Sequence, residues 1–596
     1  MPAIIFHLHG KSAETDGISV DVQTDHSLDE LRKTVAAKFS VALPTTVSFH
    51  KSGAPETTAS DLEVLAAVES ILKERTIAIL VGGKKVSGLF ISINEIHLIS
   101  RTGPTHPRSH WRHPFIGGYS EIYPDFIGNY QRLLHNYGHI VHVSYLGKSI
   151  YLTDDPDCAG IVLSEGEFYS KEIGDNHPLF PLKMSIPNGL FTADSSNLLW
   201  STSHKFMMTA MGAKAMRNYV RTMDSTAKRL VHCFDEGKAS TLSLGLRAAG
   251  QTIGELAVDV DLKMLDNADS EVVNIFQLIS TNLRLAQTLF RKGRVYRALP
   301  NPEKREQRFA TAEARAVVDK EAERILRDGH SSDMPIDKAA VSTTSLLDYM
   351  LHATDEEGRK MDVELVHQNV LTFLGARQVT TSSGLAWLWF CLTTFPVQAH
   401  KLYASLIAAG LRKDKEISAE ELGKLEYLDW FIKETQRLYN SAFQPTRQAQ
   451  KGGLLVPKGS QVTVAFHSLM INPECWKDPL TFDPERWGTE AVRRRHKYAY
   501  LLFAAGGRSC IGFNFALQEI KLVISRVVLN FQIENTTEGP VIYDPDFLLY
   551  RPLNLRIRLH KQLDPEEVIA EGTAPKVEEK VQAPQPAVGA KPLPRL

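Results

Sequence analysis

A glycine-rich turn with a single cysteine, residues 503–512 (Phe-Ala-Ala-Gly-Gly-Arg-Ser-Cys-Ile-Gly), constrains this chain more than any other stretch. A helical pattern follows directly, so Cys510 precedes a helix N-terminus, where N–H groups favour an anionic sulfur. Glycines on both sides of the cysteine allow the backbone to pass close to a flat ligand. The arrangement is typical of a thiolate that binds a haem iron, whereas a shorter motif would fit a buried structural cysteine equally well.

Two further side chains of this turn support a haem site. Arg508 can form charge-assisted hydrogen bonds with a haem propionate, and Phe503 can shield the sulfur and so tune the iron. The stretch matches the signature Phe-x-x-Gly-x-Arg-x-Cys-x-Gly at every fixed position. In this signature the chain resembles the cytochrome P450 family, and the resemblance implies haem b as the cofactor and Cys510 as the axial ligand of its iron.

Further haem contacts are implied upstream of the turn. Trp200 and His204 lie four residues apart, so they share one face of a predicted helix. By the resemblance, this pair binds a haem propionate, and Arg447 is placed as another propionate partner. Without the resemblance, a surface histidine and a core tryptophan would explain the pair as well.

A charged motif lies between the predicted helix of Trp200 and His204 and the Cys510 turn. Glu434 and Arg437 are three residues apart on a predicted helix, and Arg486 lies in the stretch Phe-Asp-Pro-Glu-Arg-Trp. Such a pair taken alone is usually solvated and contributes little. In the family the three residues form a buried cluster, so we interpret them as structural rather than catalytic.

A long apolar helix is predicted over residues 363–391, with polar residues in its middle. Alignment with the family's central helix makes Thr380 the residue that activates oxygen. The acid that normally precedes this threonine is replaced by Val379, and the usual glycine is replaced by Arg377. Without the acid, protons would arrive through water, Thr380, the substrate or Gln378.

The resemblance implies a haem-thiolate monooxygenase that inserts one oxygen atom into an apolar substrate, such as a fatty acid or a secondary metabolite. Electrons would come from NADPH through a separate flavoprotein reductase. The missing acid leaves open a peroxygenase or a lipid-hydroperoxide isomerase or dehydratase, in which Arg377 either binds a substrate carboxylate or packs between helices. A non-catalytic haem sensor is the third alternative.

Residues 1–85 form a separate segment by their pattern. Alternating and amphipathic stretches predict strands at 3–9, 17–23, 47–50 and 76–81 and a helix at 25–39. This order resembles a ubiquitin-like β-grasp domain, which is α+β. The segment would bind a protein partner or serve as an extension without one.

The remaining chain is divided in the same way. Residues 86–112 form a connector, and residues 113–562 form the haem domain. The resemblance implies that this domain is mainly α, with the cytochrome P450 fold of a helical triangular prism and small β-sheets. Residues 563–596 are rich in Pro, Ala, Lys and Glu and are predicted to be a disordered tail.

Composition argues against several other classes. The net charge of −1 does not indicate nucleic-acid binding. The five cysteines are scattered without a CxxC pair, which argues against a zinc site or a disulfide framework and for a reducing compartment. We see no signal-peptide pattern and no apolar run of about 18 residues, so we expect a cytoplasmic protein or one peripheral on the endoplasmic reticulum. The basic stretch 491–497 would be a solvated turn or a docking site for an acidic reductase surface.

Overall fold

The computed structural model describes residues 117–235, 241–267, 270–328, 332–451, 456–545, 547–562 and 582–588, together with four short strands near the N-terminus. The chain divides into two compact units, which are described separately. The first comprises residues 1–111 and 449–460, and the second comprises residues 112–448 and 461–596.

In the first unit, β1 (Ala3–Phe6) pairs with β2 (Ile18–Asp21), and β3 (His50–Lys51) pairs with β4 (Ala54–Thr58), both antiparallel. The first pair agrees with the two strands predicted there. The predicted helix at 25–39 and the last predicted strand at 76–81 lie outside the described residues. The ubiquitin-like domain therefore stays a prediction.

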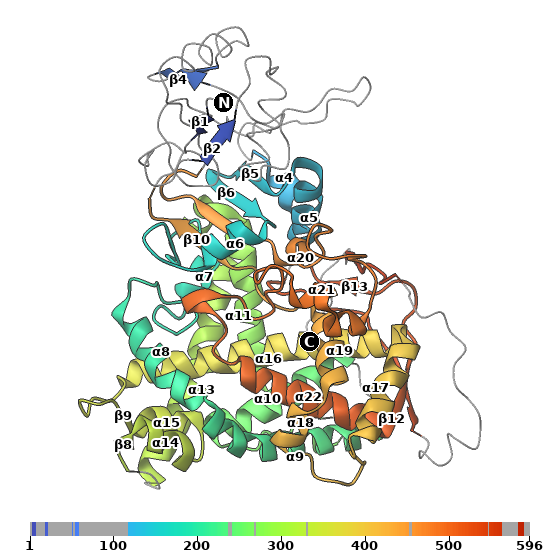
Figure 1. The fold of residues 1–596 in the computed structure, drawn as a ribbon. Helices are drawn as coiled ribbons and strands as arrows, with labels where there is room; N and C mark the ends of the chain where they lie inside the picture. Colours follow the sequence, from blue (N-terminus) through green and yellow to red (C-terminus); the bar gives the residue numbers. More distant parts are fainter. Residues whose placement is uncertain are drawn as a thin grey trace. The chain divides into compact units, whose positions relative to one another are not determined.

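Helices make up most of the second unit (Figure 1). They are α4 (Tyr119–Ile122), α5 (Phe126–Tyr137), α6 (Pro156–Leu163), α7 (Phe180–Lys183), α8 (Leu198–Ala210), α9 (Ala213–Asp235), α10 (Thr241–Val258), α11 (Asn274–Arg291), α12 (Gly293–Ala298), α13 (Pro302–Asp328), α14 (Ile336–Ser342), α15 (Leu346–His352), α16 (Val363–Thr394), α17 (Pro396–Ala408), α18 (Ala419–Gly423), α19 (Glu426–Leu438), α20 (Phe466–Leu469), α21 (Glu490–Arg493) and α22 (Phe513–Asn530), with the 3-10 helices η2 (Pro484–Gly488) and η3 (Gly506–Arg508).

The strands of this unit form small sheets. They are β5 (Ile140–Tyr145), β6 (Lys148–Thr153), β7 (Tyr169–Ser170), β8 (Met334–Pro335), β9 (Ala353–Thr354), β10 (Thr446–Ala449), β11 (Gln461–Val464), β12 (Phe531–Asn535), β13 (Ile542–Tyr543), β14 (Ile557–Lys561) and β15 (Ala587–Val588). The largest sheet has the order β5-β6-β11-β10-β7. Its hairpin β5–β6 turns at Leu146 and Gly147, whose φ angles of 47° and 72° suit a tight two-residue connection.

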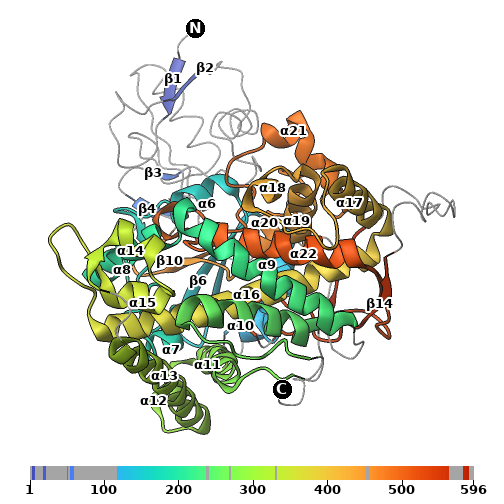
Figure 2. The same cartoon turned by 90° about the horizontal axis from the view of Figure 1, so that it is seen from below.

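The central helix of the unit is α16, which confirms the helix predicted over residues 363–391. The Asp362 side chain caps its first turn by accepting a hydrogen bond from the Glu364 N–H. Most of its residues are buried, polar ones included, as expected for a helix that is enclosed by others. It packs against α10 and α22, and Figure 2 shows these helices and α9 around it.

The tail departs from its prediction in one place. Residues 582–588, within the segment predicted to be disordered, pack on the second unit. The N–H of Ala583 donates to the Leu480 carbonyl oxygen (2.7 Å), and the Tyr439 hydroxyl donates to the Pro584 carbonyl oxygen (2.9 Å). Strand β15 pairs in parallel with β13. The prediction of disorder is therefore wrong for residues 582–588.

Membrane-spanning helices were sought in the described part of the chain. None of its helices combines the length and the apolar character needed to cross a bilayer.

One titratable contact of the fold gives a pH-dependent prediction. His139, between α5 and β5, lies 2.8 Å from Asp154 Oδ1 and 3.3 Å from Glu474 Oε1. The hydrogen bond with Asp154 raises the pKa of His139 to about 9. Because the pKa in the folded state lies above the unfolded value of about 6.5, the contact stabilises fully below that pH, and the contribution is lost as the pH rises through about 9.

We therefore expect His139→Gln to lower the free energy of unfolding by up to about 1 kcal/mol at about pH 6, since the ring is partly exposed and screened. Above about pH 9 the variant and the parent should be equally stable. Urea unfolding at the two pH values measures the difference. An equal loss at both values would show that the ring acts through packing instead.

Candidate active site

The Cys510 turn is held by its own backbone between η3 and α22. The N–H of Cys510 donates to the carbonyl oxygen of Phe503 (2.8 Å). Gly506 has a φ of +75°, and a Cβ at this position would clash with the Leu163 carbonyl oxygen, so only glycine fits. At Gly507 and Gly512, by contrast, a Cβ would meet no atom within 4 Å. The turn therefore has open space beside it.

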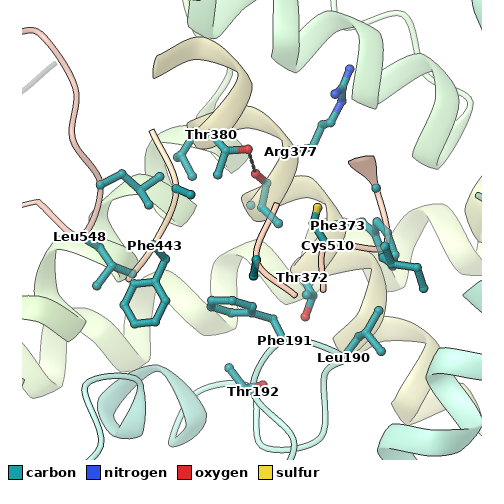
Figure 3. A pocket seen from close by; sticks show the side chains of 18 of the residues that line it. Leu190, Phe191, Thr192, Thr372, Phe373, Arg377, Thr380, Phe443, Cys510 and Leu548 are labelled. Carbon is teal, nitrogen blue, oxygen red and sulfur yellow. Dashed lines mark hydrogen bonds between the residues drawn. The ribbon is translucent and has the colours of Figure 1, made fainter. Parts of the chain in front are cut away.

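This space belongs to a cavity with a volume of about 360 Å³. It is lined by the Cys510 turn, by the middle of α16 and by loops from several parts of the chain. Figure 3 shows Phe191, Phe443 and Leu548 around it, together with Cys510 and Thr380. Most of the lining is apolar, and a cavity of this kind is the usual form of a small-molecule site.

Cys510 lines the cavity and is exposed. Burial raises the pKa of the Cys510 thiol, while a hydrogen bond from the Gly512 N–H and the charge of Arg377 oppose this shift. A metal cation would reverse the balance, because a coordinating thiol is deprotonated. The described residues hold no group of three or more His, Cys, Asp or Glu side chains that could bind a metal ion. Cys510 is therefore considered as a single protein ligand of a metal.

Three cations at the cavity wall, Lys171, Arg447 and Arg508, form what we call the cationic cluster. Arg508 donates to the Ala193 carbonyl oxygen (2.8 Å), and Lys171 donates to the Phe191 carbonyl oxygen (2.6 Å). These two contacts are with backbone carbonyl oxygens and supply no negative charge.

The carboxylate Glu165 lies within the cationic cluster. One of its oxygens is 2.6 Å from Arg447 Nε, and the other is 3.9 Å from Arg508 Nε. Burial lowers the pKa of Lys171 and of Arg447, and it lowers the pKa of Arg508 to about 10. Buried positive charge in excess of its carboxylates calls for anions. The cluster therefore fits a group that carries carboxylates, as the propionates of haem do.

The two aromatic residues predicted on one helix face lie together on α8. The rings of Trp200 and His204 are 5.1 Å apart, and both line the cavity. Arg508 lies over the Trp200 ring at 4.0 Å. Burial, with the charge of Arg508, lowers the pKa of His204. The structure thus brings these residues and Phe503 to the same cavity, and their haem contacts remain a prediction.

Lys171 is one of the cavity residues that sequence reasoning missed. It is buried, and it completes the cationic cluster. Nothing in its flanking sequence distinguishes it from a surface lysine, because its partners come from distant segments.

Thr380 also faces the cavity, from the middle of α16. Its hydroxyl donates to the Ala376 carbonyl oxygen at 2.7 Å, as Figure 3 shows. Val379, which replaces the usual acid, packs with Phe547 and Leu549. Gln378 is fully buried and lies outside the cavity lining, so it does not belong to a proton route from the cavity. Water, the substrate and Thr380 are the routes left.

Arg377 is engaged by the protein. Its guanidinium forms an ion pair with Glu519 of α22 and lies 4.0 Å from the centre of the Phe515 ring. It also donates to Thr381 Oγ1 (3.2 Å), and Figure 3 shows it directed away from Thr380. Of the two roles considered for Arg377, packing between helices is the one observed. A substrate carboxylate would have to displace Glu519.

This buried pair gives a testable prediction. Arg377→Met leaves the Glu519 carboxyl without its partner, which we expect to cost about 1–3 kcal/mol of the free energy of unfolding. Replacing both residues, as in Arg377→Met with Glu519→Met, should recover most of the loss, because apolar pairs often replace buried ion pairs without cost. Denaturant unfolding of the haem-loaded protein measures both. A double variant whose loss equals or exceeds that of the single one would contradict the pairing.

The three residues of the predicted charged cluster meet in the core, away from the cavity. Glu434 Oε1 lies 2.8 Å from Arg437 Nη2 and 2.9 Å from Arg486 Nε. Trp487 Nε1 donates to the other carboxylate oxygen at 3.0 Å. Burial alone would raise the pKa of Glu434, but the two arginines and the hydrogen bonds lower it overall. The three residues thus form a buried ionic cluster, and this geometry fits a structural role.

Comparisons with known proteins identify the family of the chain. The family model of cytochrome P450 matches residues 107–558. Cytochrome P450 monooxygenase alnD of Emericella nidulans is 32% identical over 566 residues, which covers 93% of this chain and 97% of that protein. Cytochrome P450 4d1 of Drosophila melanogaster is 26% identical over 439 residues, covering 70% of this chain and 84% of that one.

A solved structure supports the same assignment. The crystal structure of the cytochrome P450DA heme domain matches with a TM-score of 0.67 at 23% identity, covering 76% of this chain and 97% of that one, which shows a shared fold. Together with the family model and the relatives, this likeness confirms the mainly α cytochrome P450 fold. The chain belongs to the cytochrome P450 family and is a haem-dependent oxidoreductase of the monooxygenase type.

Proposed function

We propose that this protein inserts one oxygen atom from dioxygen into an apolar substrate, with electrons that NADPH supplies through a separate flavoprotein reductase. The observation that carries the proposal is that the Cys510 turn and the Thr380 turn of α16 line the same cavity. A thiolate ligand favours cleavage of the O–O bond, which is the step a monooxygenase needs.

In this proposal Cys510 binds the haem iron, and Phe503 lies beside the sulfur. Bound haem b would supply the activation of dioxygen. The residues that would hold its propionates are Trp200, His204, Arg447 and Arg508, with Lys171 as a further donor. The support is the excess of buried positive charge in the cationic cluster and the open space beside the turn.

Thr380 would position the proton source. Its hydroxyl gives its single proton to Ala376 and keeps lone pairs that can accept from a water in the cavity. Because Val379 is apolar, this position offers no acidic side chain that could supply a proton to such a water. The apolar walls around it exclude bulk water, which strengthens the remaining hydrogen bonds.

Electrostatics support a docking surface for the reductase next to the Cys510 turn. Arg493, Arg494 and Lys497 are exposed, and Arg494 pairs with Glu490. The exposed positive charges would attract an acidic reductase surface.

For the chain as a whole, we propose domains at 1–85, 113–562 and a tail at 563–596, with a connector at 86–112. We also propose a place in the cytoplasm or at the face of the endoplasmic reticulum.

The test compares two sources of oxidant. Purified protein is given dodecanoate and its methyl ester with NADPH and a reductase, or a fatty-acid hydroperoxide without either. We expect hydroxylated product in the first reaction only. Thr380→Val should lower the product formed per NADPH consumed, while Thr380→Ser retains it. Turnover of the hydroperoxide alone would overturn the proposal and favour an isomerase or dehydratase.

A further inference from the structure

Two uncharged polar side chains interrupt the apolar lining of the cavity. Asn282 comes from α11 and Thr311 from α13, two helices that pack against each other. Both residues line the cavity, and Asn282 is only 7% exposed. A polar group that is buried at a ligand cavity needs partners, so the hydrogen bonds of this pair indicate what a ligand can offer it.

The hydrogen bonds fix the orientation of the Asn282 amide. Gln307 Nε2 donates to the Pro181 carbonyl oxygen (3.1 Å) and to Asn282 Oδ1 (3.0 Å). Thr311 gives its one hydroxyl proton to the Gln307 carbonyl oxygen (2.8 Å), so it can only accept from Asn282 Nδ2 (2.7 Å). The oxygen of Asn282 therefore faces Gln307, and its nitrogen faces Thr311.

One hydrogen-bond donor of Asn282 remains. An amide nitrogen carries two N–H groups, and Thr311 takes one of them. Within the described residues no hydrogen bond accounts for the second. A ligand in the cavity can accept this N–H through an oxygen atom.

Asn282 lies close to the part of α16 that carries Thr380. Ile279, one turn before it on α11, packs against Gly375, where a Cβ would come within 3.0 Å of the Ile279 side chain. Leu283, the residue after Asn282, packs against the cluster of Val379, Phe547 and Leu549. Residues three apart share a helix face, so Asn282 lies on the same side of α11 as Ile279, while its amide is bonded to Gln307 and Thr311 of α13.

The cations of the cavity contact other residues. The side chains in the described lining that can carry positive charge are Lys171, His177, His204, Arg377, Arg447 and Arg508. Arg377 is paired with Glu519, and the cationic cluster contacts Glu165 and the backbone around residue 191. None of them is hydrogen-bonded to Asn282 or Thr311. A carboxylate at the Asn282 amide would be desolvated without a counter-charge, which is strongly unfavourable.

We propose that the substrates of this enzyme carry an uncharged oxygen acceptor, such as a ketone, an ester or an ether, and that Asn282 binds it, with Thr311 holding the amide in place. The inference rests on the proposed function, because it names the substrate class of the same cavity. Free fatty-acid anions are then poor ligands, and their neutral derivatives are better ones.

The test measures binding without electrons, so it is independent of turnover. Three probes of equal chain length are used with the haem-loaded protein at neutral pH: methyl dodecanoate, dodecanoate and dodecane. Equilibrium dialysis gives the dissociation constants. We expect the ester to bind about 5-fold to 10-fold tighter than dodecane, as one hydrogen bond allows, and tighter than the anion.

The variants assign the preference to the amide. Asn282→Leu should remove the advantage of the ester over dodecane, and Thr311→Val should reduce it. Thr288→Val is the matched control, because the Thr288 hydroxyl also donates within its helix, to the Arg284 carbonyl oxygen at 3.0 Å, outside the cavity lining. This control should leave all three constants unchanged.

Two results would overturn the inference. One is that dodecanoate binds as tightly as the ester. The other is that Asn282→Leu weakens the ester and dodecane alike, which would mean that the side chain only fills space. If Asn282→Leu does not fold, the Thr311→Val comparison decides by itself. Normal ester binding without NADPH-dependent product would leave the inference standing and refute the proposed monooxygenase reaction.

Discussion

Glu434→Gln is expected to lower the free energy of unfolding by about 3–5 kcal/mol, the usual cost of removing one charge from a buried ionic cluster. The Glu434 carboxylate is 0% exposed and lies between Arg437 and Arg486, at 2.8 Å and 2.9 Å. Glutamine keeps the size of the side chain but not its charge. Two guanidinium groups then remain in the core, with backbone carbonyl oxygens as their main acceptors.

Urea unfolding of the haem-loaded protein measures this loss. The matched control is Glu420→Gln, which removes the same charge from an exposed pair with Lys424 (2.9 Å) on the surface. We expect the control to leave the free energy of unfolding nearly unchanged, because water screens this exposed pair. If Glu434→Gln lowered the free energy of unfolding as little as this control does, the three residues would not have a structural role.

Cys510→Ala should have the largest effect on function. We expect product formation to fall to the level without enzyme, because alanine cannot bind the iron and the remaining described lining offers no second thiol. The fold should persist, since the turn is closed by the backbone bond from residue 510 to Phe503 and by glycines rather than by the sulfur. Haem content and the absorption spectrum of the reduced protein with carbon monoxide report the loss of thiolate ligation.

The control for this variant is Cys475→Ala, which removes a thiol that lies outside the cavity lining. It should retain the spectrum and the activity. A Cys510→Ala protein that keeps the carbon monoxide spectrum of the parent would mean that another residue binds the iron.

The sequence predicts those parts of the site whose residues lie close together in the chain and form short motifs. The Cys510 turn is local, because the cysteine, its glycines and the following helix are contiguous. Glu434 and Arg437 are one helix turn apart, so their pairing also follows from spacing. The long helix α16 follows from its long, mostly apolar pattern.

Contacts between distant segments could not be predicted in this way. Arg377 forms its ion pair with Glu519 on another helix, and nothing in the sequence near either residue indicates the other. Lys171 and Asn282 have ordinary neighbours in sequence and acquire their roles only from the cavity that they line. Residues 582–588 have the composition of a disordered tail, yet strand β13 and Leu480 supply the partners that order them.

The measurement that tests the central claim most directly is the origin of the oxygen atom in the product. The haem-loaded protein is given methyl dodecanoate, NADPH and a reductase under isotopically labelled dioxygen in ordinary water, and the product is analysed by mass spectrometry. The account predicts one labelled oxygen atom in each hydroxylated molecule and no product without NADPH. A product that carries unlabelled oxygen, or that forms only from an added hydroperoxide, would contradict it.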